Sequence, residues 1–552
     1  MQVGEHRIRL VVLVVFFTLF ALGLLARLLS LTVWNRAFLQ HQGDARSLRT
    51  ITIPTFRGMI VDRLGEALAI STPVQSLWIN PKTFTATPQQ QKKLAQLLGV
   101  PVNAARYPHK EFLYLKRQVM PDLAERIMSL KIPGVYAQQE FKRYYPEGES
   151  MAQILGFTNI DDQGIEGIEL AYDNWLNGVN GKKKVIKDRT GRIIDDLGVI
   201  QEPRPGHSLQ LTLDKRIQFF AYNELVATLE KFAAKSGSVV VLDAANGEIL
   251  AVANAPSFNP NLREKYTHDT YRNKALTDTF EPGSVMKPFA IASALESGHF
   301  NAHSIIDTRP STMFVQGHII RDVHNYGVLD VTGVLRNSSN VGVSKMVLTS
   351  PPEQLIDLLK KCGISERTET NYPGESYGSI VDNRQAKPFV LATLSFGYGL
   401  SATALQIARA YSVFANHGKI MPVSLFHNPK PGLQVMQAKT ADTLLSMLEA
   451  VVQEGTGKSA MIAGYRVAGK TGTAILAGKK GYTEKNYMSS FVGIAPVSNP
   501  KIIVAVFINE PNKHKGYYGA AVAAPLFAKV METSLRLMNV PYDAQRGYDD
   551  KS

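Results

Sequence analysis

At residues 281–287 the chain reads Glu-Pro-Gly-Ser-Val-Met-Lys, which places Ser284 three residues before Lys287. Two further motifs follow in order, Ser338-Ser339-Asn340 and Lys470-Thr471-Gly472-Thr473. Residues three apart on a helix share one face, so this spacing predicts the Ser284 hydroxyl beside the Lys287 amine. A serine hydroxyl needs an adjacent base, and a lysine becomes one when burial or a nearby cation lowers its pKa. Together the three motifs predict a serine acyl-transfer site.

The two later motifs contain groups that suit this chemistry. Ser338 and Asn340 lie two apart, which on a loop aims a hydroxyl at a leaving amine and an amide at the substrate backbone. The run Lys470-Thr471-Gly472 is typical of a strand edge, where glycine leaves room for an extended peptide to lie alongside. Lys470 is also the candidate for the cation near Lys287. Each motif alone is weak, since a serine–lysine pair is more often a solvated helix face, so it is their order that favours the site.

A competing pattern overlaps the third motif. Residues 464–471 read G-Y-R-V-A-G-K-T, which fits the P-loop pattern of nucleotide-binding proteins. A P-loop requires a strand before its first glycine and a helix starting at its lysine. Here a polar turn at 454–458 precedes the pattern, and residues 473–476 read as a strand that runs into a turn. We therefore favour the acyl-transfer interpretation.

Longer stretches around the motifs resemble class B penicillin-binding proteins, and within that family the division-specific members of Gram-negative bacteria. The resemblance covers nearly the whole chain and is carried by E-P-G-S-V-M-K-P-F at 281–289, R-N-S-S-N-V-G-V-S-K at 336–345, S-F-G-Y-G-L-S-A-T-A-L-Q-I-A-R-A-Y at 395–411 and V-A-G-K-T-G-T-A at 467–474. It implies an α+β fold with a single N-terminal transmembrane helix, an elongated pedestal domain and a penicillin-binding (transpeptidase) domain. The last of these is β-lactamase-like, with an antiparallel sheet covered by helices.

The resemblance also implies a reaction, the D,D-transpeptidation of peptidoglycan. It further implies that β-lactam antibiotics, which mimic the D-Ala-D-Ala end of the substrate, acylate the same serine. Ser284 is implied as the nucleophile, Lys287 as the general base, Ser338 with Lys470 as the proton relay to the leaving amine, and Asn340 as a group that orients the substrate. The implied substrate-binding residues are Thr471, Gly472, Thr473, Tyr487 and Tyr517. Implied partners are stem peptides ending in D-Ala-D-Ala, a SEDS-family glycosyltransferase and other divisome membrane proteins, and the inner membrane. No cofactor is expected.

Several neighbouring functions stay open or are disfavoured. A D,D-carboxypeptidase, an elongation-specific transpeptidase and a divisome scaffold with vestigial catalytic residues are alternatives. A class A β-lactamase is disfavoured because no E-x-x-L-N loop lies between the second and third motifs. A class D β-lactamase would have an apolar residue in place of Asn340.

Composition excludes other classes. The 552 residues, of which 45% are hydrophobic, predict two soluble domains with sizeable cores. The single Cys362 excludes an internal disulfide and is expected to be a buried thiol, and the 12 histidines show no metal-ligand spacing, so no metal is predicted. The net charge of +14 suggests anionic surfaces as partners. Nucleic acid is disfavoured because the basic residues are dispersed, and the main run, at 182–184, reads as a solvated turn.

The N-terminal region predicts a membrane anchor. Residues 10–26 are uncharged and almost wholly apolar, and the apolar pattern resumes after Arg27 as far as Trp34. About twenty apolar residues span a bilayer, and no cleavage site follows promptly, which favours an uncleaved signal anchor. Basic residues flank both ends, so the orientation rests on the resemblance, which implies a cytoplasmic N-terminus and a periplasmic catalytic domain.

We expect an anchor at 1–35, a pedestal at 36–205 and the transpeptidase domain at 206–552. In the pedestal region, 57–66 reads as a hairpin and 164–178 as a turn leading into an amphipathic helix. In the second domain the pattern predicts strands at 208–213, 237–242, 248–253, 491–494 and 502–508, and helices at 214–232 and 524–537. Strands at both ends with helices between indicate an α+β fold.

Overall fold

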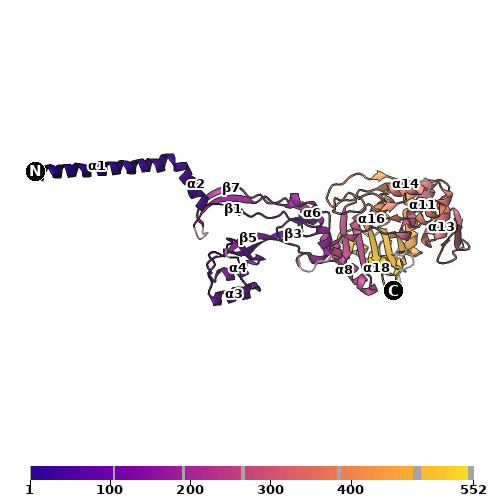
Figure 1. The fold of residues 1–552 in the computed structure, drawn as a ribbon. Helices are drawn as coiled ribbons and strands as arrows, with labels where there is room; N and C mark the ends of the chain where they lie inside the picture. Colours follow the sequence, from indigo (N-terminus) through magenta and orange to yellow (C-terminus); the bar gives the residue numbers. More distant parts are fainter. Residues whose placement is uncertain are drawn as a thin grey trace. The chain divides into compact units, whose positions relative to one another are not determined.

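The computed structural model describes residues 2–103, 106–107, 109–188, 193–262, 268–381, 387–476 and 486–544. It contains two compact units. The first combines Met1–Phe56, Pro73–Lys142 and Gly178–Gly206, and the second combines Arg57–Thr72, Arg143–Asn177 and His207–Ser552. The two units therefore interleave along the sequence (Figure 1).

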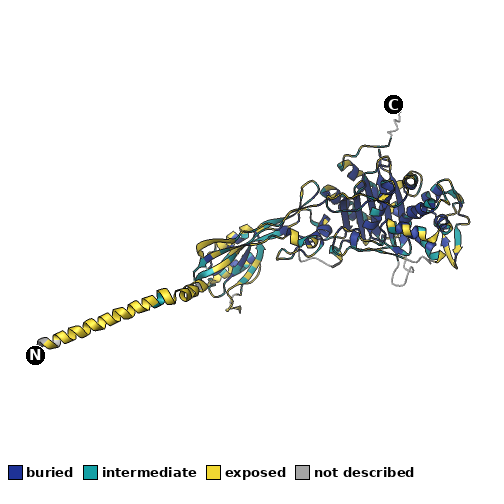
Figure 2. Ribbon diagram, turned by 90° about the horizontal axis from the view of Figure 1, so that it is seen from above, coloured by how far each residue is buried: buried dark blue, intermediate teal, exposed yellow. Residues whose placement is uncertain are grey.

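The N-terminal helix of the first unit has the properties of a membrane span. Helix α1 (Gln2–Leu29) continues into the π-helical segment η1 (Ser30–Trp34). The stretch His6–Trp34 is long and apolar enough to cross a membrane, and none of its most apolar part is buried within the protein (Figure 2). Exposed apolar side chains in that number need a lipid environment, which supports a single-pass membrane anchor.

A three-stranded sheet follows the anchor in the same unit. Helix α2 (Arg36–Ser47) leads into β1 (Leu48–Ile53), which pairs with β6 (Gly181–Lys187), and β6 pairs with β7 (Ile193–Gln201). The lysine run at 182–184 was expected in a turn, and this prediction is wrong. These lysines lie inside β6, because β1 and β7 pair with β6 on both sides.

The rest of the first unit packs two helices on strands. Helix α3 (Pro88–Leu98) begins at a capping box formed by Thr87 and Gln90. Its buried leucines join a small core with residues of β4 (Leu113–Val119), α4 (Pro121–Met128) and the end of β3 (Ala67–Ile79). Strand β5 (Val135–Tyr144) also pairs with β3.

The second unit is built on a five-stranded antiparallel sheet, as the α+β prediction required. Its strand order is β10-β9-β21-β20-β19. The strands are β9 (Ser236–Asp243), β10 (Ile249–Ala255), β19 (Ala468–Ile475), β20 (Tyr487–Ala495) and β21 (Ile502–Asn509). The expected strands at 237–242, 491–494 and 502–508 are confirmed within somewhat longer strands, and the strand expected at 248–253 is found at Ile249–Ala255.

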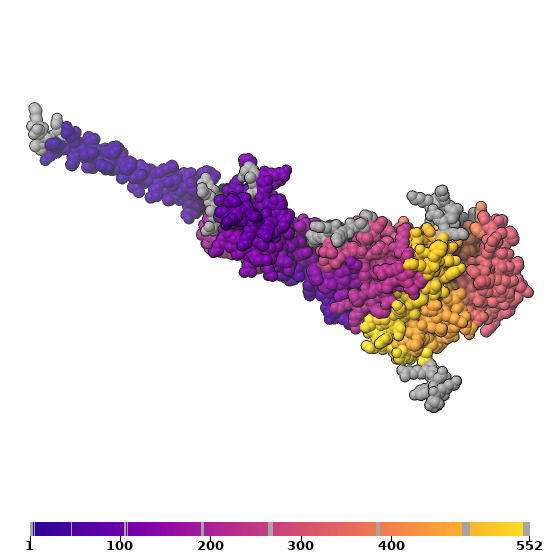
Figure 3. All heavy atoms as spheres, turned by 90° about the horizontal axis from the view of Figure 1, so that it is seen from below, coloured from indigo at the N-terminus to yellow at the C-terminus, as the bar shows by residue number. Residues whose placement is uncertain are grey.

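Helices cover both faces of this sheet, which explains why its strands are continuous apolar runs. In β9, Val239 and Val241 point into one core cluster, and Val240 and Leu242 into the other. Helices α8 (Lys215–Phe232) and α18 (Gly519–Leu537) pack on the first face. Helices α11 (Lys287–Glu296) and α16 (Ala404–Ala415) pack on the second. In the space-filling view, the segments of this unit after residue 207 form one continuous body (Figure 3).

Two predicted helices and one predicted strand are refined by these bounds. The Asp214 side chain accepts a hydrogen bond from Arg216 N and caps α8, as expected. Helix α18 begins five residues before the expected residue 524, at Gly519. The strand expected at 208–213 shortens to β8 (Leu209–Gln210), which pairs in parallel with β2 (Ile60–Val61). The expected hairpin at 57–66 is confirmed as the β2–β3 turn.

The remaining elements of the second unit are short or flank the sheet. Longer helices are α12 (Val331–Arg336), α13 (Asn340–Thr349), α14 (Pro352–Lys361), α15 (Pro388–Leu394) and α17 (Ala438–Gln453). Single turns are η3 (Gly148–Ser150), α5 (Ala152–Leu155), α6 (Gly167–Ala171), α7 (Asp173–Leu176), α9 (His268–Tyr271), α10 (Lys274–Thr277), η5 (Gly283–Met286) and η6 (Lys458–Ala460). Two-stranded antiparallel pairs form between β11 (Ile305–Asp307) and β14 (Val328–Asp330), β12 (Thr312–Val315) and β13 (His318–Arg321), β15 (Ser379–Ile380) and β16 (Leu400–Ser401), and β17 (Lys419–Ile420) and β18 (Leu433–Gln434).

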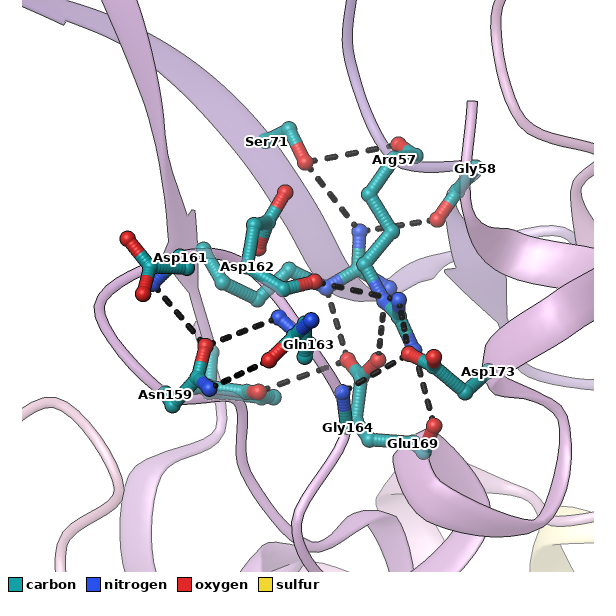
Figure 4. A network of polar contacts seen from close by, with 12 residues as sticks. Arg57, Gly58, Ser71, Asn159, Asp161, Asp162, Gln163, Gly164, Glu169 and Asp173 are labelled. Atoms are coloured by element: carbon teal, nitrogen blue, oxygen red, sulfur yellow. Dashed lines mark hydrogen bonds and ion pairs between the residues drawn. The ribbon is translucent and has the colours of Figure 1, made fainter. Parts of the chain in front are cut away.

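A buried network of ion pairs lies within the second unit (Figure 4). Arg57 Nε donates to Glu169 Oε2 at 2.6 Å, and Arg143 Nε donates to Glu169 Oε1 at 2.7 Å. Arg57 Nη1 also donates to Asp173 Oδ1 at 2.6 Å. All three side chains of the Arg57–Glu169–Arg143 group have 0% exposure, so each charge depends on its partners. The centre of this ion-pair network is therefore fully buried.

Candidate active site

The first motif lies at the start of a helix. Ser284 belongs to the 3₁₀ turn η5, and Lys287 is the first residue of α11. Pro288 occupies the first turn of α11, where its missing N–H is no loss. Ser284 is partly exposed, whereas Lys287 is 1% exposed. The site therefore offers a reachable hydroxyl above a buried amine.

Close packing holds the backbone around Ser284. Gly283 has φ +66°, a conformation that favours glycine, and donates its N–H to the Gly397 carbonyl at 3.2 Å. A Cβ on Gly397 would lie 2.2 Å from the Gly283 carbonyl oxygen, so the two glycines meet where no side chain fits. The buried Tyr411 hydroxyl donates to the Val285 carbonyl at 2.7 Å. The stretch at 395–411, which carries part of the family resemblance, thus holds the backbone of the serine turn in place.

The second motif joins two helices. Ser338 lies in the turn after α12, and Asn340 is the first residue of α13. The sequence analysis expected both residues on a loop, and for Asn340 this is wrong. The Ser339 hydroxyl accepts from Gly342 N at 2.8 Å and caps α13, which is why the helix begins there. Ser338 has φ +58°, the left-handed region that few non-glycine residues occupy. Such strain persists only where the surrounding structure imposes it.

Two lysines converge on the Ser338 hydroxyl. Lys287 Nζ and Lys470 Nζ each donate to Ser338 Oγ at 3.0 Å. Lys287 Nζ also donates to the Ser338 carbonyl oxygen. Within the part of the chain that the structure describes, Lys287 makes no hydrogen bond to the Ser284 hydroxyl. The expected Ser284–Lys287 contact is therefore replaced by a contact between Lys287 and Ser338. A hydrogen bond between a nucleophile and its base often forms only when substrate is bound.

Burial lowers the pKa of both amines, and the neighbouring Lys287 lowers that of Lys470 further. Burial lowers the pKa of Lys287 to about 7, partly opposed by the negative charge of Asp322. Burial, and then repulsion by Lys287, holds the pKa of Lys470 well below its ordinary value. Two amines that share one hydroxyl in a dry environment cannot both be fully charged. The pair therefore carries fewer than two positive charges near neutral pH. One amine is then neutral for part of the time and can act as a base.

The third motif lies on the free edge of the sheet, where the sequence predicted it. Lys470 is in the middle of β19, and β19 is the last strand in the sheet order. An edge strand exposes unpaired backbone groups that can pair with an extended peptide. A P-loop lysine would start a helix, so the nucleotide-binding interpretation is wrong for this chain.

The second half of β19 is tightly packed, which accounts for the glycine at position 472. A Cβ on Gly472 would lie 2.2 Å from Ser490 Oγ and 3.0 Å from Val285 Cγ1. The latter contact places η5 against β19 and so brings the first and third motifs together. Gly519, at the start of α18, donates its N–H to Thr473 Oγ1 at 3.0 Å. A Cβ on Gly519 would lie 2.3 Å from the Gly472 carbonyl oxygen, so Gly519 is required there for space.

Three tyrosines gather at the same end of β19. Tyr487 pairs with Ile475, the last residue of β19, and its ring centroid lies 4.3 Å from that of Tyr517. Tyr517 and Tyr518 stack at 4.3 Å and directly precede Gly519, which binds Thr473. Stacked rings at this spacing form a rigid apolar surface. The predicted pair Tyr487 and Tyr517 is thus together, next to the third motif.

The sequence analysis missed two residues that support the site, and it correctly predicted one buried residue outside the site. Asp322 accepts three hydrogen bonds from residues 339–341, and Tyr411 supports the serine turn. Tyr411 ends the 395–411 stretch that carries part of the family resemblance, which was the one signal available for it, whereas no pattern pointed to Asp322. Cys362 is buried, as expected, and burial raises the pKa of its thiol to about 12. Among the described residues, no group of three His, Cys, Asp or Glu side chains could hold a metal ion.

Comparisons with known proteins agree with this site. The family model for the penicillin binding protein transpeptidase domain matches residues 237–532, and the model for the penicillin-binding protein dimerisation domain matches residues 52–211. The chain is 42% identical over 551 residues to the probable peptidoglycan D,D-transpeptidase PbpC of Pseudomonas aeruginosa, covering 98% of this chain and 97% of the relative. It is 41% identical to the peptidoglycan D,D-transpeptidase FtsI of Escherichia coli, covering 94% of this chain and 90% of the relative.

Solved structures give the same result at lower identity. The crystal structure of penicillin-binding protein 3 from Mycobacterium tuberculosis in complex with aztreonam has a TM-score of 0.70 at 28% identity, covering 90% of this chain and 98% of that one. A peptidoglycan synthetase from Bifidobacterium adolescentis has a TM-score of 0.71 at 25% identity, with the same coverage. With a transpeptidase model matched over more than half its length and relatives above 40% identity over nearly all of it, the chain belongs to the class B penicillin-binding proteins.

Proposed function

We propose that this chain is a peptidoglycan D,D-transpeptidase that cross-links stem peptides, at the division septum, through an acyl-enzyme on Ser284. The observation that carries the proposal is the pair of buried lysines 3.0 Å from the Ser338 hydroxyl, next to a partly exposed serine. That arrangement provides a nucleophile, a base and a proton relay in one place. The names of the relatives support the substrate class.

In the first step, Ser284 Oγ attacks the carbonyl carbon of the penultimate D-alanine. Neutral Lys287 takes the hydroxyl proton, the bond to the terminal D-alanine nitrogen breaks, and that nitrogen leaves as an amine after gaining a proton. In the second step, an amine of a neighbouring stem peptide attacks the ester carbonyl and loses a proton to the Ser338–Lys470 relay. The bond between the carbonyl carbon and Ser284 Oγ breaks, and that oxygen takes back the proton held by Lys287. A new amide replaces the old one, so no external energy source is needed.

The Ser338 hydroxyl is placed to deliver the proton to the leaving amine. A hydroxyl has two acceptor lone pairs and one donor proton. Because both lysines donate to Ser338 Oγ, both lone pairs are used, and the hydroxyl proton is left to point toward a substrate atom. Lys470 then replaces that proton, which is the relay proposed for Ser338 and Lys470.

Other residues bind the substrate in this proposal. The backbone amides of Ser284 and Thr473 form the oxyanion hole, where removal of one donor typically costs about 10²- to 10³-fold in rate. Thr471 and Thr473 hold the substrate carboxylate, and Gly472 lets the peptide lie along β19. Asn340 orients the peptide: its amide nitrogen is itself held by the Arg321 carbonyl at 3.0 Å. Tyr487 and Tyr517 form an apolar wall for the substrate side chain.

The proposal includes location and partners. The N-terminal span anchors the chain in the inner membrane with its N-terminus in the cytoplasm, so that the catalytic domain meets peptidoglycan in the periplasm. We propose boundaries at 1–35 for the anchor, 36–205 for the pedestal and 206–552 for the transpeptidase domain. Within the divisome, a SEDS-family glycosyltransferase is the proposed supplier of the glycan strands that this chain cross-links.

Labelling with a fluorescent penicillin tests the enzyme assignment. Detergent-solubilised full-length protein is incubated with the drug, and the labelled peptide is identified by mass spectrometry, with Ser284→Ala as the matched control. We expect a stable adduct on Ser284 and none on the variant. Folded protein without an adduct would overturn the proposal in favour of a scaffold, and rapid drug turnover would indicate a β-lactamase.

A second assay separates the transpeptidase from a D,D-carboxypeptidase. Stem peptides ending in D-Ala-D-Ala are supplied with and without an acceptor amine, and both free D-alanine and cross-linked dimer are measured. We expect dimer formation that depends on the acceptor. Release of D-alanine at the same rate with no dimer would assign water as the acceptor. Septation in cells that depend on the Ser284→Ala variant would contradict the need for catalysis and favour the divisome scaffold.

A further inference from the structure

The carboxylate of Asp322 lies beside the second motif and binds its backbone. Asp322 follows the hairpin strand β13 and is far in sequence from the helix that it contacts. Its Oδ2 accepts from the Ser339 hydroxyl at 2.6 Å. Its Oδ1 accepts from the backbone N–H groups of Asn340 at 2.5 Å and Val341 at 3.0 Å. Both carboxylate oxygens are therefore used on three consecutive residues.

These contacts complete the cap of α13. The first N–H groups of a helix have no partner within the helix. Here Asp322 takes two of them, and the Ser339 hydroxyl takes the next, from Gly342 at 2.8 Å. The preceding residue, Arg321, holds the Asn340 side chain through its carbonyl oxygen at 3.0 Å. Residues 321 and 322 thus fix both the backbone and the amide of the motif.

The fixed residues border Ser338, whose backbone conformation is strained. Ser338 at φ +58° is held on one side by α12, whose Leu335 carbonyl accepts its N–H at 3.1 Å. On the other side it is continuous with Ser339, which Asp322 binds. A change in this turn moves the one hydroxyl that both lysines bind. A displacement of about 1 Å in a reacting group can cost up to about 100-fold in rate.

Asp322 is also the carboxylate that acts on Lys287. The titratable groups that face this cluster are Lys287 from α11, Lys470 from β19, Asp322 from the turn after β13, and Tyr326. Burial lowers the affinity of both lysines for a proton, and repulsion by Lys287 lowers it further at Lys470. The negative charge of Asp322 opposes this effect at Lys287.

We propose that Asp322 is a positioning residue for acyl transfer, which fixes the Ser338–Asn340 turn through three hydrogen bonds and places a negative charge near Lys287. This inference rests on the proposed function. It gives Asp322 two separable roles, one in geometry and one in electrostatics. Among the described residues its hydrogen bonds go to Ser339, Asn340 and Val341 and not to Ser284, so it acts through the second motif.

The experiment compares the pH dependence of acylation in Asp322→Asn and in a matched cap variant. The second-order rate of labelling by a fluorescent penicillin is measured from pH 5 to pH 9 on full-length protein, with Tm measured in parallel. The control is Asp330→Asn, because Asp330 caps α12 by accepting from Gly333 N at 2.6 Å and makes no contact with the lysines or Ser338 among the described residues.

For Asp322→Asn we expect the rate to fall by about 10- to 100-fold. We also expect the acid limb of the profile to shift to lower pH, because loss of the carboxylate leaves Lys287 harder to protonate. Asp330→Asn should lower Tm with an unchanged limb. If the two variants lose Tm equally and neither limb moves, Asp322 is only a helix cap and the inference is wrong.

A second variant covers a folding failure and separates the two roles. Asp322→Glu keeps the charge and displaces the carboxylate, so we expect a slower rate with an unchanged acid limb. A limb that shifts as far as in Asp322→Asn, or a rate equal to wild type, would overturn the inference. If the wild-type protein is not labelled on Ser284, the proposed function itself fails, and that result is distinct from either outcome.

Discussion

Two clusters of charge are buried in the second unit, and they differ in how the charges are balanced. In the Arg57–Glu169–Arg143 network, each cation donates to a carboxylate oxygen at 2.6–2.7 Å. At the catalytic motifs, Lys287 and Lys470 share a neutral hydroxyl, and neither has an ion-pair partner among the described residues. Burial is nearly complete in both.

The contrast separates a structural site from a reactive one. Burial disfavours a charge unless a partner compensates for it. Burial lowers the pKa of Arg57, but Glu169 and Asp173 outweigh this effect and raise it, so Arg57 stays charged. Burial lowers the pKa of both lysines, and the negative charge of Asp322 opposes this only in part at Lys287. An amine that can lose its proton near pH 7 is a base, whereas a paired guanidinium is a fixed support.

The largest effect is expected where the unbalanced charge is removed. Lys287→Met should slow acylation by about 10²- to 10⁴-fold, the usual contribution of a general base. The variant should have an unchanged or higher Tm, because the substitution removes a buried ammonium group that has no ion-pair partner and therefore costs folding free energy. The measurement is the labelling rate with a fluorescent penicillin, together with a thermal melt. Lys345→Met is the control, since Lys345 is a half-buried lysine of α13 whose amine donates to the Asp307 carbonyl at 2.6 Å, and a strong loss of Tm in Lys287→Met would contradict the comparison.

Breaking the balanced cluster should do the reverse. Glu169→Gln leaves Arg57 and Arg143 without their shared carboxylate, which should destabilise the protein by about 3–5 kcal/mol. The labelling rate per folded molecule should stay close to wild type. Urea unfolding measures the first quantity. Glu224→Gln, in an exposed pair with Lys529 at 2.7 Å, is the control and should cost less than about 1 kcal/mol. Equal losses in the two variants would show that the buried network is not special.

The reactive cluster should also show itself in a pH profile. Lys287 must be neutral to act as a base, so the acylation rate of wild-type protein should rise with pH and level off above about pH 7. Below that value it should fall by about tenfold per pH unit. The profile is measured from stopped-flow labelling rates. A flat rate between pH 5 and pH 8 would exclude Lys287 as the group that takes the proton.

The smallest effect concerns one member of the network region, Asp162. Burial raises the pKa of Asp162 from 3.8 to about 6, partly offset by Arg143. A raised carboxyl pKa means that the folded state binds the proton more tightly, so this stabilisation is present below about pH 3.8 and lost as pH rises through about 6.

Asp162→Asn should therefore remove a pH dependence and leave activity intact. The substituted amide cannot titrate, and asparagine tolerates the φ of +63° at this position. Unfolding free energies measured in urea at pH 4.5 and pH 7 should differ less in the variant than in wild type, by about 1–3 kcal/mol. An unchanged difference would assign the pH dependence to other carboxyls.

The sequence was a good guide where a local rule decided the structure. The apolar run at 10–26, the Asp214 cap of α8 and the apolar strands of the sheet follow from periodicity and capping, which act over a few residues. The fold class and the three motifs were therefore predictable. The lysine run at 182–184 was misplaced because its local pattern suits a turn, whereas pairing with strands from distant segments makes it part of β6.

What the sequence determined by itself is which residues this protein has for its chemistry: a serine and a lysine in one helical turn, a hydroxyl and an amide two apart, and a lysine on a strand edge. Only the tertiary structure decided how these residues meet. It brings Lys287 to Ser338 and not to Ser284, places Asp322 beneath the second motif, and requires glycine at 519 because the Gly472 carbonyl is 2.3 Å from where a Cβ would lie. The physical reason is that spacing along the chain fixes only local neighbours, whereas the pKa of a buried group depends on every charge that folding brings within a few ångströms.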